Sequence, residues 1–215
     1  MIIEYKQVGP FGENTYLLAC SQTAQAALVD PGGDEAWVQS QLQAHGLELR
    51  YFMLTHGHLD HVGGLSAAVR KWPAARIVMH PAEQPVYDSV PMQSAMFGLR
   101  MEPPPTLSEA KNARFVRDGE LLELGALRFE VLHVPGHSPG HVVYLEQQHG
   151  VLFSGDLLFA GSVGRTDLPG GDAAQMRQSL ARVCSLSPTL RVLSGHGPET
   201  TLGEELASNP FLRHL

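Results

Sequence analysis

Residues 55–61 read Thr-His-Gly-His-Leu-Asp-His, directly after an apolar run that is typical of a buried strand. His56 and His58 are two residues apart, so their side chains point the same way in an extended segment. Asp60 and His61 follow at the expected start of a helix, where adjacent side chains diverge and can reach one point from different directions. Three imidazoles and one carboxylate at the end of a strand predict a metal site.

The ligand chemistry of this stretch narrows the choice of metal. Nitrogen and carboxylate ligands without a thiolate suit Zn²⁺, with iron and manganese as alternatives. The other interpretation is a polar loop of surface histidines. It explains the pattern less well, because ligand-type residues are packed too densely here for an arbitrary polar loop.

Three more candidate ligands each follow a predicted strand and a glycine. They lie in the sequences Pro-Gly-His, Ser-Gly-Asp and Ser-Gly-His. A glycine beside each one lets the backbone come close to a shared centre. Five histidines and two aspartates would serve two metal ions about 3.5–4 Å apart, with one carboxylate bridging them. The seven candidate ligands are His56, His58, Asp60, His61, His137, Asp156 and His196.

The composition agrees with a globular metalloprotein. The chain has 215 residues, 43% of them hydrophobic and 17% charged, so it can bury a real core, and we expect one domain over residues 1–215. Eleven histidines against fifteen lysines and arginines are a high share for the commonest metal-ligand residue. The net charge of −7, without a run of Lys or Arg, argues against nucleic acid and membrane surfaces as partners.

The cysteines and the N-terminal sequence point to a compartment. Cys20 and Cys184 lie far apart and outside any Cys-x-x-Cys pair, which excludes a cysteine zinc finger, an iron–sulfur cluster and a disulfide framework. The N-terminal residues do not resemble a secretory signal, and no apolar stretch is long enough to span a bilayer. We therefore expect a cytoplasmic protein.

The rest of the chain mixes short strands and helices, with several strands joined in hairpins. A helix is expected between Asp34, its N-terminal cap, and Gly46, a second over residues 60–72, and a third that starts at Asp172. Residues 81–111 show no sustained period, so we expect an irregular segment there. These patterns predict a mixed sheet, or a pair of sheets, covered by helices.

The motifs, taken in order, resemble the metallo-β-lactamase fold superfamily. The order is HxHxDH, then PGHxPGH, then SGD, then GHG. The resemblance covers nearly the whole chain, from the Asp-Pro-Gly of residues 30–32 to His196. Within the superfamily the chain is most similar to short bacterial glyoxalase II-like hydrolases, through residues 163–167, 96–99 and 209–212.

This resemblance implies an α/β fold of four layers, αββα, in which two mixed sheets are flanked by helices and the site lies at one edge of the sheets. It assigns three residues to the first metal, namely His56, His58 and His137. It assigns three others to the second metal, namely Asp60, His61 and His196. Asp156 would bridge the two metals, and Asp60 and Asp156 are the catalytic candidates.

The resemblance also implies an activity. The chain is expected to be a metal-dependent thioester hydrolase, similar to glyoxalase II, that cleaves S-D-lactoylglutathione or a related acyl thioester with a metal-bound hydroxide. The cofactors would be two divalent ions, with zinc favoured and iron or manganese as alternatives. The partner would be this small-molecule thioester. A thiolate leaves readily, so the reaction demands no strong general acid.

The chain departs from the larger glyoxalase II enzymes in ways that affect the expected substrate. Those enzymes hold glutathione with a C-terminal helical region and carry a tyrosine after the last metal histidine, where this chain has Gly197. Residues 81–111 either supply a lid and part of the substrate pocket or pack as an insertion over a sheet face. The lid would use Tyr87, Met92, Met96 and Phe97. Arg165 either binds an anionic substrate or braces its turn by pairing with Asp167.

The alternative function is a mononuclear iron persulfide dioxygenase of the same fold, which holds one iron with two histidines and a carboxylate. The Gly-Arg-Thr-Asp turn at residues 164–167 resembles those enzymes. Against them, the motif around His137 continues to His141, where they tend to have cysteine. An exported β-lactamase, a nucleic-acid hydrolase and a non-catalytic binding protein fit less well, because a signal peptide and a basic surface are lacking and all seven candidate ligands are present.

The remaining histidines receive other interpretations. His141 is expected to support the site through hydrogen bonds, and His133 is expected to be a buried or edge residue. The others read as ordinary loop or surface residues, namely His45, His80, His149 and His214.

Overall fold

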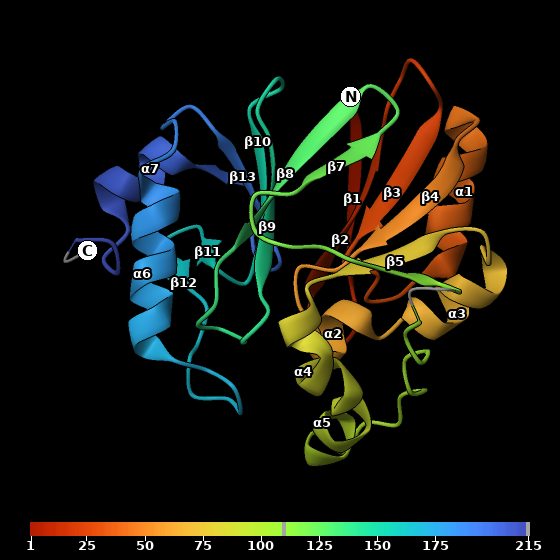
Figure 1. Cartoon of the computed structure of the whole chain (residues 1–215), viewed down its shortest axis with the longest axis horizontal. Coiled ribbons are helices and arrows are strands. Elements are labelled where there is room, and N and C mark those ends of the chain that lie inside the picture. The colour runs from red at the N-terminus through yellow and green to blue at the C-terminus, as the bar shows by residue number, and fades with distance from the viewer. Residues whose placement is uncertain (109–110, 214–215) are drawn as a thin grey trace.

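Two six-stranded β-sheets face each other at the centre of the computed structural model, which describes residues 1–108 and 111–213 (Figure 1). In the first sheet the strands follow chain order. They are β1 (Ile2–Val8), β2 (Glu13–Ala19), β3 (Gln25–Val29), β4 (Glu48–Met53), β5 (Arg76–Met79) and β6 (Ala113–Phe115). β1 to β3 pair antiparallel and β3 to β6 pair parallel, so the sheet is mixed.

The second sheet has the order β14-β13-β10-β9-β8-β7. Its strands are β7 (Leu121–Leu124), β8 (Leu127–His133), β9 (Val142–Glu146), β10 (Val151–Gly155), β13 (Arg191–Ser194) and β14 (Thr200–Thr201). All its pairs are antiparallel except β10 with β13, so this sheet is also mixed. A separate two-stranded ribbon joins β11 (Leu158–Phe159) to β12 (Ser162–Val163).

Helices cover both outer faces of the sheets, as Figure 1 shows. α1 (Glu35–His45) and α3 (Leu65–Lys71) pack on the first sheet, and α6 (Ala173–Cys184) and α7 (Leu202–Ser208) pack on the second. The remaining helices are α2 (Leu59–Val62), the 3₁₀ turn η1 (Pro81–Glu83), α4 (Gln84–Asp88) and α5 (Val90–Met96). The layers are therefore helix, sheet, sheet and helix, which confirms the αββα prediction.

Strand β2 illustrates why this sequence forms buried sheets. All its residues are buried, and successive side chains point to opposite faces of the sheet. Tyr16 and Leu18 lie in the core between the sheets, whereas Leu17 and Ala19 lie in the core beneath α1. A strand covered on both faces needs apolar residues on both, which explains the apolar run of residues 16–19, whereas the first three residues of β2 are polar.

Two buried tyrosines tie the sheets together in opposite directions. Tyr16 of the first sheet donates a hydrogen bond to the carbonyl of Ser194, at 2.7 Å, in the second. Tyr144 of the second sheet donates to the carbonyl of Leu54, at 2.8 Å, at the end of β4 in the first. Both carbonyls come directly before segments that carry candidate ligands, so these bonds fix the two halves of the site relative to each other.

The structure corrects two sequence-based predictions about helices. The helix predicted over residues 60–72 is divided into α2 and α3 at Gly63 and Gly64. The chain packs so closely there that a Cβ on Gly64 would lie 2.7 Å from the Cα of Gly33. Residues 81–111, predicted to be irregular, begin with η1, α4 and α5, which are too short for a helical period to stand out.

Two helix starts agree with prediction. Asp34 caps α1 by accepting a hydrogen bond from the backbone of Trp37, and Gly46 ends that helix in the left-handed conformation. Asp172 likewise caps α6. Within the part of the chain that the structure describes, no helix has both the length and the apolar character needed to cross a bilayer.

The tyrosine ties predict a stability difference between two conservative changes. Tyr144→Phe leaves the buried Leu54 carbonyl without its donor, so we expect the free energy of unfolding to fall by about 1–3 kcal/mol. Tyr5→Phe is the matched control, because that ring is exposed and the change should stay within about 0.5 kcal/mol. Urea unfolding at equilibrium measures both values, and equal effects of the two changes would contradict the role given to Tyr144.

Candidate metal centre

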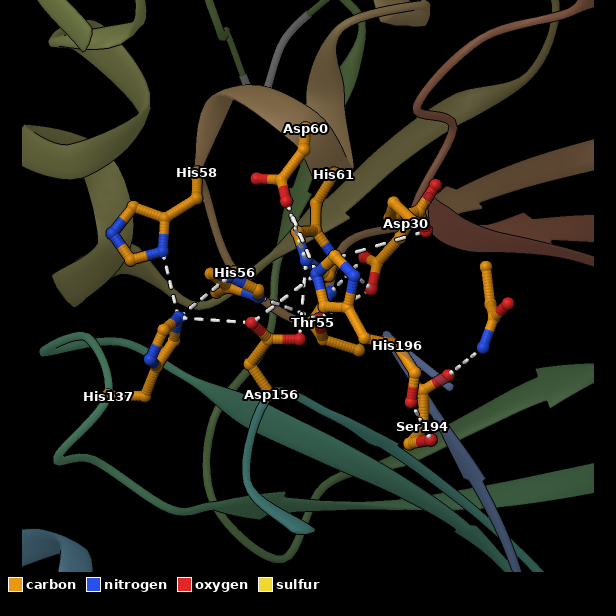
Figure 2. A network of polar contacts seen from close by, with 12 residues as sticks. Asp30, Thr55, His56, His58, Asp60, His61, His137, Asp156, Ser194 and His196 are labelled. Carbon is orange, nitrogen blue, oxygen red and sulfur yellow. Dashed lines mark hydrogen bonds and ion pairs between the residues drawn. The ribbon is translucent and has the colours of Figure 1, made fainter. Parts of the chain in front are cut away.

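The seven predicted ligands converge at one edge of the sandwich, although they come from both sheets (Figure 2). His56 and His58 follow β4, and Asp60 and His61 lie on α2. From the second sheet come His137, after β8, Asp156, after β10, and His196, after β13. The site therefore exists only when the two sheets are packed together.

Three histidines form the first half of the centre. The Nε2 atom of His137 lies 3.2 Å from Nε2 of His56 and 2.9 Å from Nδ1 of His58. All three side chains are buried. Burial and the neighbouring imidazoles lower the pKa of His56 and His137 and bring that of His58 down to about 3. The rings are thus neutral at pH 7, and their nitrogens point at one another, as the ligands of a cation do.

The second half consists of Asp60, His61 and His196. Oδ2 of Asp60 lies 3.2 Å from Nε2 of His196 and 3.8 Å from Nε2 of His61. One ligand atom from each residue falls within 4.8 Å of the others, which is close enough for all three to contact one ion. Burial would raise the pKa of Asp60, but His61 and His196 beside it hold that pKa below its usual value.

Asp156 lies between the two halves. Its Oδ1 is 3.3 Å from Nε2 of His61, and its Oδ2 is 3.5 Å from Nε2 of His137. Burial would raise its pKa, but the adjacent His61 and His137 hold the pKa far below the usual range. The carboxylate is therefore ionised and has one oxygen directed at each half, as a bridging ligand requires.

Unsatisfied polar atoms show that a cation fits this cluster. Nε2 of His61 and Oδ1 of Asp156 are buried without a hydrogen-bond partner among the described residues. Leaving such atoms unpaired is costly in a protein interior. Burial would lower the pKa of His61, but Asp156 and Asp60 beside it raise that pKa well above its usual value. These carboxylates therefore favour positive charge at this point, and the nitrogen and oxygen donors suit a dinuclear metal site.

Asp30 orients His61 and was not predicted as a site residue. Its Oδ2 lies 3.0 Å from Nδ1 of His61, so it accepts the Nδ1 proton and leaves the Nε2 lone pair directed into the centre. Both carboxylate oxygens also accept hydrogen bonds from Thr55, at 2.7 Å from its backbone and 2.6 Å from its hydroxyl. The sequence did contain a signal for this role. Asp30 follows a predicted strand and precedes Pro-Gly, and the proposed ligands also lie after strands.

Arg165 contributes to the site in an unexpected way. Its guanidinium forms a bidentate ion pair with Asp167, with Nε 2.6 Å from Oδ1 and Nη2 2.7 Å from Oδ2. This is the bracing role that the sequence analysis considered. Its backbone carbonyl accepts a hydrogen bond from Nδ1 of His137 at 2.8 Å. This contact fixes the tautomer of His137 and directs Nε2 towards the centre. Sequence patterns cannot indicate a role carried by a main-chain atom.

Glu83 joins the two loops that carry His56, His58 and His137, and the sequence analysis missed it. Oε1 accepts from the backbone of Gly57 at 2.9 Å, and Oε2 accepts from the Ser138 hydroxyl at 2.8 Å and the Gly140 backbone at 2.7 Å. Burial raises its pKa, and these three donors oppose the shift. All three partners donate, so both oxygens of Glu83 act as acceptors, which favours the ionised form.

The other histidines have varied environments. His141 is buried and stacks on His56, and its Nε2 accepts a hydrogen bond from the backbone of Asp156 at 3.0 Å, in agreement with a supporting role. His133 is half-buried and stacks on His80, with ring centroids 4.1 Å apart, so neither is an isolated surface residue. His214 lies outside the described residues.

Comparisons with known proteins agree with this geometry. The family model of the metallo-beta-lactamase superfamily matches residues 8–196. Hydroxyacylglutathione hydrolase GloC of Haemophilus influenzae is 36% identical over 214 residues, which are 99% of this chain and 98% of the relative.

Two solved structures share the fold over their full lengths. TTHA1623, crystallised in a di-iron-bound form, matches with a TM-score of 0.87 and 40% identity, over 97% of this chain and 100% of the other. The B3 metallo-beta-lactamase BLEG-1 also matches with a TM-score of 0.87, at 34% identity, over 99% of this chain and 100% of the other. The names of GloC and BLEG-1, at 36% and 34% identity, thus indicate different substrates.

The three donors around Glu83 predict that Glu83→Gln weakens metal binding. An amide group placed at this position turns an N–H towards at least one N–H or O–H donor, so the two ligand loops should separate. We expect metal affinity to fall roughly 10–100-fold, as for other groups that hold ligands in place. Competition with a chromophoric chelator measures this affinity.

Glu48→Gln is the control, because Glu48 is an exposed side chain whose ion pair with Arg50 lies on the surface. It should leave the metal affinity unchanged. Unaltered affinity in Glu83→Gln would show that the loops hold their positions without this carboxylate.

Proposed function

Because the chain belongs to the metallo-beta-lactamase superfamily and is a metal-dependent hydrolase, we propose that its substrate is an acyl thioester, either S-D-lactoylglutathione or a related one. The observation that carries the proposal is the full-length similarity to hydroxyacylglutathione hydrolase GloC. The convergence of all seven ligand-type side chains supports it, because a chain that had lost the activity would have no need to keep them together.

The proposed first metal is held by His56, His58 and His137, and the proposed second by Asp60, His61 and His196, with Asp156 as the bridge. Zinc is the proposed metal, and iron and manganese are alternatives that the same donors accept. When bound, such ions lower the pKa of a water to near neutrality and polarise the carbonyl that is attacked.

The chain's own residues position these groups and handle protons. Asp30 and the Arg165 carbonyl fix the ring orientations of His61 and His137, so that their lone pairs are ready before any ion arrives. A cavity opens onto the metal centre, and Asp60 forms part of its lining. Asp60 is ionised, so its carboxylate can accept a proton from the attacking water. Neither cysteine lines that cavity, which agrees with hydrolysis that needs no protein nucleophile.

We further propose a small-molecule partner and a cytoplasmic location. Among the described residues that line the cavity at the metal centre, Arg165 is the only Lys or Arg, and its guanidinium is paired with Asp167, which does not suit a nucleic acid backbone. Cys20 and Cys184 are both free thiols, as is usual in a reducing compartment.

The proposal predicts that the zinc-loaded protein hydrolyses S-D-lactoylglutathione, and that Asp156→Asn removes this activity. The amide loses the charge that the bridging position requires, so we expect kcat/KM to fall by at least about 100-fold, beyond the losses typical of groups that only support a ligand. Release of free thiol, followed with a thiol reagent, measures the rate. Asp172→Asn is the control, since asparagine caps a helix as well as aspartate does.

A second assay separates the persulfide dioxygenase alternative. Oxygen consumption is followed with glutathione persulfide and the iron-loaded protein. Oxygen uptake without thioester hydrolysis would overturn the proposed function and favour the dioxygenase, whereas hydrolysis without oxygen uptake supports the hydrolase.

A further inference from the structure

A cavity of about 450 Å³ opens onto the candidate metal centre. This volume lies in the range of small-molecule binding sites. Five of the seven proposed ligands form part of its lining, so a molecule in the cavity lies against the reacting centre. They are His58, Asp60, His137, Asp156 and His196.

The remaining walls of this cavity are largely apolar. One wall comes from α5 and the residue that follows it, with the side chains of Met92, Met96 and Phe97. The turn after β1 adds Phe11, whose ring meets that of Phe97 edge-on with centroids 5.2 Å apart. A further part of the lining comes from the segment after β10 and includes Phe159, Val163 and Leu168.

The α5 wall exposes an unusual amount of apolar surface. Met92 is 57% exposed, Met96 68% and Phe97 50%. Met92 and Met96 are four residues apart, so they share one face of the helix. Large apolar side chains that gather beside a cavity, instead of packing into the core, mark a binding surface. Methionine is suited to such a surface, because its flexible thioether adapts to different ligand shapes.

Tyr87 differs from these three residues, although the lid hypothesis grouped it with them. It is buried in the core beside the first sheet, and its hydroxyl donates to the carbonyl of Pro105 at 2.8 Å. Residues 81–111 therefore combine both sequence-based interpretations: part of the segment packs as an insertion, and α5 lines the cavity.

The polar groups in the lining are occupied by the protein itself. The Arg165 guanidinium is paired with Asp167. The Gln93 amide donates to Val86 and Ser89 and accepts from the backbone of Leu59. Glutathione carries two carboxylates and an ammonium group, and the described lining offers its carboxylates no unpaired Lys or Arg.

We propose that this cavity binds an uncharged, apolar arm of the thioester, so that the preferred substrate is an apolar thioester instead of a glutathione conjugate. This inference rests on the proposed function, because it concerns the substrate of the same site. The apolar arm is either the acyl group or the thiol group, and both present the same chemistry to Met92, Met96 and Phe97.

Two series of neutral thioesters distinguish the acyl and thiol arms. In the first, N-acetylcysteamine thioesters carry acetyl, butanoyl, hexanoyl and phenylacetyl groups. In the second, acetyl thioesters carry ethyl, butyl and hexyl thiols. We expect kcat/KM to rise about two- to fourfold per added methylene in one series, as transfer of a CH₂ group out of water predicts. The longer members of that series should exceed S-D-lactoylglutathione.

The double variant Met92→Gln/Met96→Gln tests which wall causes this trend. It should flatten the dependence on chain length, because the added methylenes then meet polar amides. Both methionines are already exposed, so the fold should tolerate the change. Leu206→Gln on α7 is the matched control: it alters an exposed apolar side chain outside the cavity lining and should keep the wild-type trend.

Binding of ketone analogues, in which CH₂ replaces the sulfur, separates failure of this proposal from failure of the proposed function. Calorimetry with the metal-loaded protein should show affinity that rises with chain length, and that falls in the double variant. Turnover of S-D-lactoylglutathione with no chain-length trend in either series would overturn the apolar site and keep thioester hydrolysis. Chain-dependent binding without turnover of any thioester would overturn the hydrolase and support the apolar cavity.

Discussion

The buried cluster of aspartates and histidines where the two sheets meet constrains the positions of the surrounding strands and loops more than any other feature. Two carboxylates and five imidazoles converge there, most of them buried, and two of their buried atoms, Nε2 of His61 and Oδ1 of Asp156, make no hydrogen bond among the described residues. Burial of such groups is unfavourable unless a cation compensates for it. The strand ends, the glycines before the ligands and the tyrosine ties all serve to hold this cluster in place.

Because the ligands come from both sheets, packing and chemistry are coupled. Tyr16 and Tyr144 cross between the sheets and bind carbonyls next to ligand segments. Asn14 adds a further link, since its side chain donates to the carbonyls of Ser194 and Gly197 around the His196 turn. Glu83 joins the remaining loops. A small displacement of one sheet relative to the other would therefore alter the distances in the metal centre.

The sequence could predict the parts of the site that carry a local signal. Each proposed ligand is a histidine or aspartate near a strand end, and the three downstream ligands each follow a glycine, so the seven could be selected one by one. Their assignment as metal ligands stays a prediction. The pattern of strands and helices predicts only one or two mixed sheets covered by helices, and the four layers come from the family resemblance that the motif order carries.

The parts that could not be predicted depend on contacts between distant segments. Glu83 looks like any acidic residue near a helix start until folding places Gly57 and Gly140 around it. The split between α2 and α3 arises from close packing against Gly33, which no local pattern reveals. The exposed face of α5 can be interpreted only beside the cavity, where Phe11, which is distant in the sequence, contacts Phe97.

The metal content of the protein after zinc loading and removal of excess ion tests most directly whether this cluster holds two ions. Elemental analysis against the protein concentration should give two metal ions per chain, because each half of the cluster supplies three ligands and Asp156 serves both. A value of one, or none, would contradict a dinuclear metal centre in this cluster.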